Sequence, residues 1–103
     1  MPPSDYDITG SIKAIEALKL ELLQSVVSLL SSMANQRHRH EEHLACLSDT
    51  LVRTYVLAAK LGVKFSELDE KAADDIRVHI AKQDDTLASD YSALLRHIRR
   101  PQS

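Results

Sequence analysis

The sequence predicts an all-α fold, and three features of its composition support this. The chain has 103 residues, the size of one small domain, and its prolines lie only at positions 2, 3 and 101. No proline therefore interrupts the chain between them, and only two glycines occur in the whole sequence. With one phenylalanine and no tryptophan, the core must be aliphatic. We expect a single domain over residues 1–103, with an irregular lead-in over 1–8 and a tail over 99–103.

The first predicted element is a long helix from Ile12 to Ala34, which Thr9 or Ser11 would cap. Its apolar residues form two adjacent stripes at helical spacing. The first stripe is Ile12, Ile15, Leu22, Val26, Leu29 and Met33, and the second is Leu20, Leu23, Val27, Leu30 and Ala34. A helix with two apolar stripes buries more than one side. We therefore expect it to pack within its own chain and against a partner chain.

Three further helices are predicted, one long and two shorter. The long one runs from His40 to Leu61, antiparallel to the first after a turn at 35–39, and Gly62 is the natural residue to end it. The shorter helices span about 66–82, capped by Ser66 with Asp69, and about 89–98. The expected fold is thus a helical bundle of two long antiparallel helices and two shorter ones. A chain this short buries a limited fraction of its surface, so we expect a homo-oligomer, either a dimer or a tetramer.

The net charge and the cysteine content indicate which partners and which cellular compartment to expect. The net charge is −2, so a nucleic-acid partner is not expected, although basic residues cluster at 37–39 and 96–100. The single cysteine, Cys46, excludes an internal disulfide and fits a reducing compartment, so we expect a cytoplasmic protein. The N-terminus shows no signal-peptide pattern. No uninterrupted apolar stretch approaches about 20 residues, so no membrane association is expected.

Two acids on the long helices are candidate ligands. Asp49 lies three residues after Cys46 in an apolar run, and a buried carboxylate needs a partner, a metal or a route to solvent. The alternative to a metal is an ion pair with Arg53, four residues further on, or a hydrogen bond to another helix. Glu21 lies on the first helix, and helical bundles build metal sites from carboxylates on adjacent helices, although a solvated Glu21 is the simpler interpretation. The histidines of residues 38–43 lack the H-E-x-x-H spacing, so no zinc site is predicted.

The stretch LSDTLVRTYVLAAKLGVKFSELDEK, residues 47–71, resembles the second and third helices of MazG-like proteins. These are all-α nucleoside triphosphate pyrophosphohydrolases. Leu57–Val63 and Ser66–Lys71 carry the most specific part, and the rest of the chain resembles a shorter MazG-like subfamily. The resemblance implies carboxylates in two motifs, E-E-x-x-E and E-x-x-D, that hold Mg²⁺. It also implies cleavage of a nucleoside triphosphate between the α and β phosphates by a metal-activated water.

Carried onto this sequence, the resemblance implies an incomplete metal site. Asp49 matches the last acid of E-x-x-D, and Cys46 stands where that motif has its glutamate. In the first motif only Glu21 matches, and Glu42 lies one turn before Cys46. Glu21, Glu42 and Asp49 are therefore the candidate Mg²⁺ ligands, where the family pattern has five acids. No catalytic residue is assigned, because a thiol is a poor ligand for Mg²⁺.

Three functional hypotheses remain open at this point. The leading one is a MazG-like nucleotide pyrophosphohydrolase-family protein with an incomplete acidic metal site, weakly active or non-catalytic. Such a protein would bind a nucleoside triphosphate or serve as an interaction module. The first alternative is an active Mg²⁺-dependent enzyme that releases pyrophosphate, with further acids from the third helix or a partner chain. The second alternative is a purely structural helical oligomer.

Overall fold

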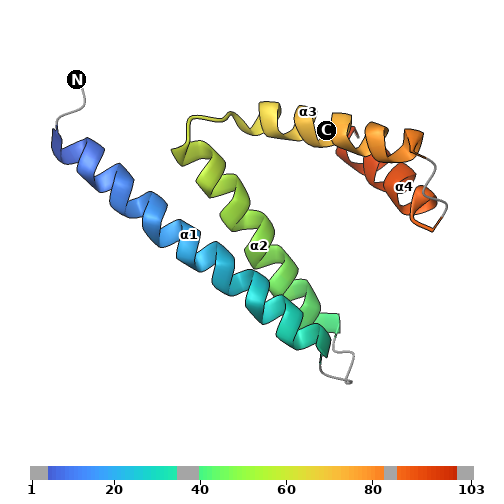
Figure 1. The fold of residues 1–103 in the computed structure, drawn as a ribbon, viewed down its shortest axis with the longest axis horizontal. Coiled ribbons are helices and arrows are strands. Elements are labelled where there is room, and N and C mark those ends of the chain that lie inside the picture. The colour runs from blue at the N-terminus through green and yellow to red at the C-terminus, as the bar shows by residue number, and fades with distance from the viewer. Residues whose placement is uncertain (1–4, 35–39, 83–85, 100–103) are drawn as a thin grey trace. The chain divides into compact units, whose positions relative to one another are not determined.

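The computed structural model describes residues 5–34, 40–82 and 86–99, with side chains from residue 10 onward. These residues form four helices and no strand, which confirms the all-α prediction (Figure 1). The helices are α1 (Asp5–Ala34), α2 (His40–Lys60), α3 (Phe65–Ala81) and α4 (Ala88–Ile98). The chain divides into two compact units, residues 1–63 with α1 and α2, and residues 64–103 with α3 and α4. That residues 1–103 act as one domain stays a prediction.

The first helix begins seven residues earlier than predicted. It starts at Asp5, so residues 5–8 of the expected lead-in are helical and the predicted caps at Thr9 and Ser11 lie inside the helix. Gly10, between these two residues, also lies inside the helix. A glycine inside a helix is less favourable than alanine by only about 1 kcal/mol, so it does not end a helix that has no proline behind it.

The end of α2 agrees with the prediction. Gly62 has a φ of 81°, the left-handed conformation that glycine adopts without a steric penalty. Its N–H donates to the carbonyl of Ala59 at 3.1 Å, and the N–H of Val63 donates to the carbonyl of Ala58 at 2.8 Å. This pair of bonds is a Schellman motif, which satisfies the last carbonyls of the helix.

The start of α3 corrects the predicted cap. The N-cap residue is Lys64, whose N–H donates to the Oε1 atom of Glu67 at 3.0 Å. The helix therefore begins at Phe65, and Glu67 is the acid that reaches back, instead of the predicted pair of Ser66 and Asp69. The start of α4 lies one residue before the predicted position. The predicted turn at 35–39 and Pro101 lie outside the described residues.

The helices α1 and α2 lie side by side and run antiparallel (Figure 1). Most of the first apolar stripe of α1 is half-buried, namely Ile15, Leu22, Val26 and Leu29. The ends of that stripe, Ile12 and Met33, are exposed, as are Leu20, Leu23, Val27 and Leu30 of the second stripe. One stripe of α1 therefore packs within the chain, and the other is left uncovered in this unit.

The centre of the α1–α2 contact consists of small residues with hydroxyl groups. Ser25 of α1 is buried, and its Oγ donates to the carbonyl of Leu22 at 2.7 Å. Thr50 of α2 lies with its Oγ1 3.2 Å from the Oγ of Ser25 and 2.9 Å from the carbonyl oxygen of Cys46. A hydroxyl carries one hydrogen, so the shorter bond, to Cys46, takes it. Small side chains at this point let the two helices approach closely.

The second unit is held by a different kind of contact. Ala73 and Ile76 of α3 are buried, and the ring of His79 stacks on that of Tyr91 of α4 with centroids 4.8 Å apart. Near the end of α4, the Nη1 of Arg99 donates to the Oε1 of Glu70 at 2.9 Å. Aliphatic burial, ring stacking and one ion pair thus join α3 to α4.

The segment Gly10–Ala34 of α1 is long and apolar enough to span a membrane, with a mean hydropathy of 1.3. Core helices of soluble proteins, which are mostly buried, and N-terminal signal sequences have the same length and composition, and 6% of this segment is buried. A single helix of this kind is weak evidence for a membrane span.

Candidate functional site

Arg53 of α2 lies between the two acids that the sequence singled out on the long helices. Its Nη1 is 3.6 Å from the Oδ1 of Asp49, and its Nε is 3.9 Å from the Oε2 of Glu21. The Nη1 also lies 3.4 Å from the backbone carbonyl oxygen of Asp49. The Nε is buried and makes no hydrogen bond among the described residues, since 3.9 Å is too long for one. The link to Glu21 is therefore an electrostatic attraction between charges on two helices.

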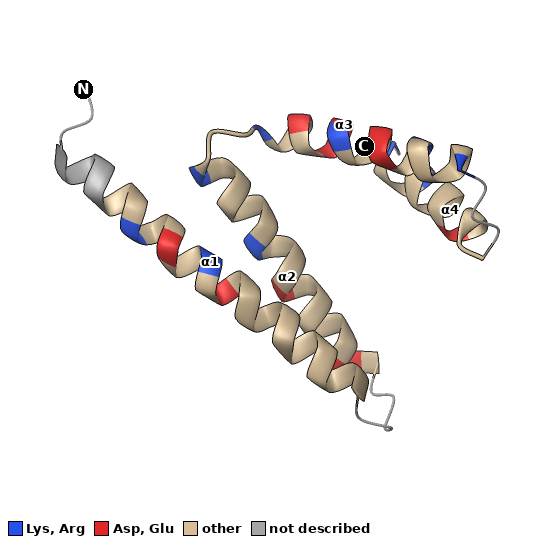
Figure 2. Ribbon diagram, in the orientation of Figure 1, with Lys and Arg blue, Asp and Glu red and all other residues tan. Residues whose placement is uncertain are grey.

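The two acids are more exposed than the apolar run around Asp49 predicts. The side chain of Glu21 is 54% exposed and that of Asp49 is 62% exposed. Neither carboxylate is thus a buried charge that needs a metal for its stability. The predicted ion pair of Asp49 with Arg53 is present in the structure. Figure 2 shows that the charged residues in the described part of α1 end at Glu21, and residues 22–34 carry no charge.

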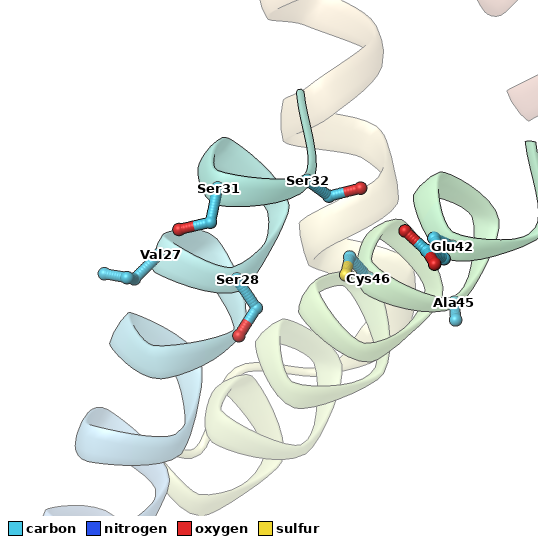
Figure 3. A pocket seen from close by; sticks show the side chains of 7 residues that line it. All are labelled: Val27, Ser28, Ser31, Ser32, Glu42, Ala45 and Cys46. Carbon is cyan, nitrogen blue, oxygen red and sulfur yellow. The ribbon is translucent and has the colours of Figure 1, made fainter. Parts of the chain in front are cut away.

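Glu42, the third predicted ligand, lines a groove between the end of α1 and the start of α2. The groove has a volume of about 460 Å³ and is open to solvent (Figure 3). Its lining is Val27, Ser28, Ser31 and Ser32 from α1 with Glu42, Ala45 and Cys46 from α2. Cys46 is half-buried there as a free thiol. The Oγ of Ser32 is buried and makes no hydrogen bond within the part of the chain described.

The three predicted ligands are not brought together as one Mg²⁺ shell. Glu42 and Asp49 are seven residues apart on α2, which is about 10 Å along a helix axis. Mg²⁺ holds its oxygen ligands at about 2.1 Å, so these two carboxylates do not share one ion without large rearrangement. Within residues 5–34, 40–82 and 86–99, no group of three or more histidines, cysteines or acids could hold a metal. The assignment of Mg²⁺ to Glu21, Glu42 and Asp49 stays a prediction.

Sequence reasoning missed two features of this region. The i, i+4 pairing of Arg53 with Asp49 was predicted, but the contact of Arg53 with Glu21 depends on how α1 lies against α2. The second feature is the set of serines that line the groove. A sequence signal for them exists, because Glu21, Ser28 and Ser32 recur every four to seven residues and so lie along one face of α1.

The two long helices of this all-α chain each bring one carboxylate, Glu21 and Asp49, close to the guanidinium of Arg53. The MazG-like family model matches residues 8–94, which is most of the chain. The chain therefore belongs to the MazG-like family, a nucleotide pyrophosphohydrolase-like family. No curated protein and no solved structure matches the sequence.

Proposed function

We propose that this MazG-like chain has an incomplete acidic metal site and hydrolyses nucleoside triphosphates weakly or not at all. It acts instead as a nucleotide-binding or interaction module. The observation that carries this proposal is the ion pairing of Arg53 with both Glu21 and Asp49. A guanidinium group stays charged at any physiological pH, so it competes directly with a divalent cation for the same two carboxylates.

The thiol of Cys46 is the second observation in favour of this proposal. It lies one turn before Asp49 on the same helix, at the position where the family motif has its glutamate. Mg²⁺ prefers hard oxygen ligands, and a thiol does not supply one. Two exposed carboxylates that already have an arginine partner would hold Mg²⁺ only weakly, and a weakly held metal gives little activation of water.

Binding of a triphosphate is compatible with the same residues. The guanidinium of Arg53 can make two parallel hydrogen bonds to a phosphate, and it is one-third exposed on this face of the hairpin. To do so it must release its carboxylate partners. We therefore expect any nucleotide affinity to be modest and to depend on Arg53.

Hydrolysis is tested by measuring pyrophosphate release from a panel of nucleoside triphosphates with Mg²⁺. We expect rates close to those without protein. The variants are Asp49→Ala and, as a matched control, Asp74→Ala, which removes a carboxylate of similar exposure from α3. Robust turnover that Asp49→Ala abolishes and Asp74→Ala leaves intact would overturn the proposal and favour the active enzyme.

Nucleotide binding is tested by thermal unfolding with a non-hydrolysable triphosphate. A ligand that binds the native state raises the melting temperature by mass action. For a binding module, we expect a rise at millimolar nucleotide that Arg53→Met removes. An unchanged melting temperature rules out the nucleotide-binding role and leaves the interaction role.

A further inference from the structure

The groove and Arg53 lie on the same side of the α1–α2 hairpin. On α2, two residues of the groove, Cys46 and Glu42, precede Arg53 by seven and eleven residues. At about 100° per residue, both intervals return to within about 20° of the same direction. On α1, two serines of the groove follow Glu21 by the same two intervals, and Glu21 meets Arg53. The two rows form one continuous surface, the polar strip, which consists of Glu21, Ser28 and Ser32 with Arg53, Cys46 and Glu42.

The two ends of the polar strip differ in charge and lie far apart. Arg53 and Glu42 are eleven residues apart, which is about 16 Å along a helix axis. Once it releases its carboxylate partners, the guanidinium of Arg53 suits a phosphate. Glu42 carries the only charge among the described residues that line the groove, and a carboxylate repels phosphate. A ligand that covers the strip is therefore elongated, with its negative charge at Arg53 and an uncharged group in the groove.

The groove itself has the size and the polar groups for such an uncharged group. Its volume of about 460 Å³ is in the range of small-molecule sites, and three serine hydroxyls line it beside Glu42. The Oγ of Ser32 points toward α2 (Figure 3), is buried, and makes no hydrogen bond within the part of the chain described. A buried hydroxyl without a partner is unfavourable, so a ligand that bonds to it gains affinity.

A nucleoside triphosphate has this construction, because its charge lies on the phosphates and its ribose and base are uncharged. Among the common bases, guanine fits the carboxylate of Glu42 best. Its N1–H and N2–H₂ groups are adjacent donors that can bond to the two oxygens of one carboxylate. Adenine and cytosine place a ring acceptor beside their amino group, and uracil has a single ring N–H between two carbonyl acceptors. A carboxylate repels these acceptors.

We propose that the groove binds the guanine nucleoside of a nucleoside triphosphate, with Glu42 as the residue that determines the base. This inference rests on the nucleotide-binding role proposed above, in which the phosphates contact Arg53. It adds a second contact point on the same side of the hairpin and a preference for guanine. The remaining hydroxyls of the groove are donors for the O6 and N7 atoms of the base.

The single cysteine of the chain is a built-in reporter of groove occupancy. Cys46 lines the groove as a half-buried free thiol, so a nucleoside bound there shields it from iodoacetamide. The two probes are GTP and inorganic tripolyphosphate, which has the phosphates without the nucleoside. We expect GTP at ten times its dissociation constant to slow alkylation about tenfold. Tripolyphosphate should raise the melting temperature without slowing alkylation.

The outcomes of this experiment separate the two proposals. If GTP raises the melting temperature and leaves the alkylation rate unchanged, the groove proposal is wrong and nucleotide binding stands. The same conclusion follows if tripolyphosphate protects Cys46 as well as GTP does, because a phosphate would then occupy the groove. If neither probe raises the melting temperature, nucleotide binding itself fails, and the groove proposal fails with it.

The base preference is tested by titration calorimetry with GTP and ITP, which lacks the 2-amino group of guanine. We expect the wild type to bind GTP roughly tenfold more tightly than ITP, because ITP loses one of two parallel hydrogen bonds. Glu42→Gln should remove this difference. Glu41→Gln is the matched control, because Glu41 is an exposed neighbour in the same first turn of α2 and does not line the groove. Equal affinities of the wild type for GTP and ITP, or an equal effect of both variants, would overturn the role of Glu42.

Discussion

The two helix pairs of this chain use their apolar residues in opposite ways. In the α1–α2 pair, only Ser25 and Ala58 are buried among the described residues, Leu22 and Leu29 are half-buried, and Leu23, Leu30, Leu44, Leu47 and Leu51 are exposed. In the α3–α4 pair, Ile76 and Ala73 point inward, and the rings of His79 and Tyr91 stack across the contact. The contacts between α1 and α2 therefore bury less apolar surface than the apolar residues of these two helices could provide.

The difference places the candidate site and the buried aliphatic core in different helix pairs. Full burial of one large apolar side chain contributes roughly 1.5–3 kcal/mol to the free energy of unfolding. The exposed leucines of the hairpin do not make this contribution within the hairpin. The same pair carries Arg53, the two acids and the groove. The second pair carries no residue of the candidate site. Its contacts are those of a small stabilising element.

The largest effect that this comparison predicts is at Ile76, which is 5% exposed. Ile76→Ala should lower the free energy of unfolding by about 2–5 kcal/mol, because the removed atoms leave a cavity between α3 and α4. Val78→Ala, at a position 51% exposed on the same helix, should change it by less than about 0.5 kcal/mol. Urea denaturation followed by circular dichroism measures both. Equal effects would mean that the second pair has no core of its own.

The two glycines give the next largest effect, with opposite signs. Gly62→Ala forces a side chain into φ 81°, which should lower the free energy of unfolding by about 1–2 kcal/mol. Gly10 lies inside α1 with no atom within 4 Å of an added Cβ, so Gly10→Ala should raise it by about 0.5–1 kcal/mol. Thermal unfolding of both variants is the measurement. A rise for Gly62→Ala would show that the left-handed conformation of Gly62 does not hold the end of α2, and a fall for Gly10→Ala would contradict the open space around Gly10.

Much of the fold was predictable because its signals are local. Helical spacing and the lack of proline indicated the four helices, and Gly62 marked the end of α2 correctly. The boundaries that were missed depend on small energies. The predicted caps at Thr9 and Ser11 lie inside α1, and at the start of α3 the N–H of Lys64 donates to Glu67, where Ser66 with Asp69 was predicted.

The candidate site was less predictable because it combines residues from two helices. Asp49 with Arg53 could be read from their spacing on one helix. The contact of Arg53 with Glu21, like that of Ser25 with Thr50, follows from the relative position of α1 and α2 along their axes. The periodicity of one helix predicts which of its sides faces the neighbouring helix. It does not predict which residue of one helix contacts which residue of the other.

Ser25 and Ser28 test whether the hydroxyl contact matters to the first pair. Ser25 is buried and bonded to Leu22, with Thr50 beside it, so Ser25→Ala should lower the free energy of unfolding by about 1 kcal/mol. Ser28 is exposed on the same helix, and Ser28→Ala should change it by less than about 0.5 kcal/mol. Urea denaturation compares the two variants. A loss that is as large for Ser28→Ala would show that the buried contact of Ser25 does not determine the result.

The smallest predicted effect compares the ion pairs that cross each helix pair. Arg99 meets Glu70 at 2.9 Å, a hydrogen-bonded distance, whereas Arg53 meets Glu21 at 3.9 Å. Both pairs are partly exposed, so each should couple by less than about 1 kcal/mol, with the larger value for Arg99 and Glu70. Double-mutant cycles to alanine, measured by urea denaturation at low salt and at roughly tenfold higher salt, should show both couplings falling as salt screens the charges. A larger coupling for Arg53 and Glu21 would make Arg53 a structural clamp of the hairpin. A coupling near zero would mean that the contact with Glu21 does not stabilise the fold. The position of Arg53 between Glu21 and Asp49 would then favour a role in the candidate site.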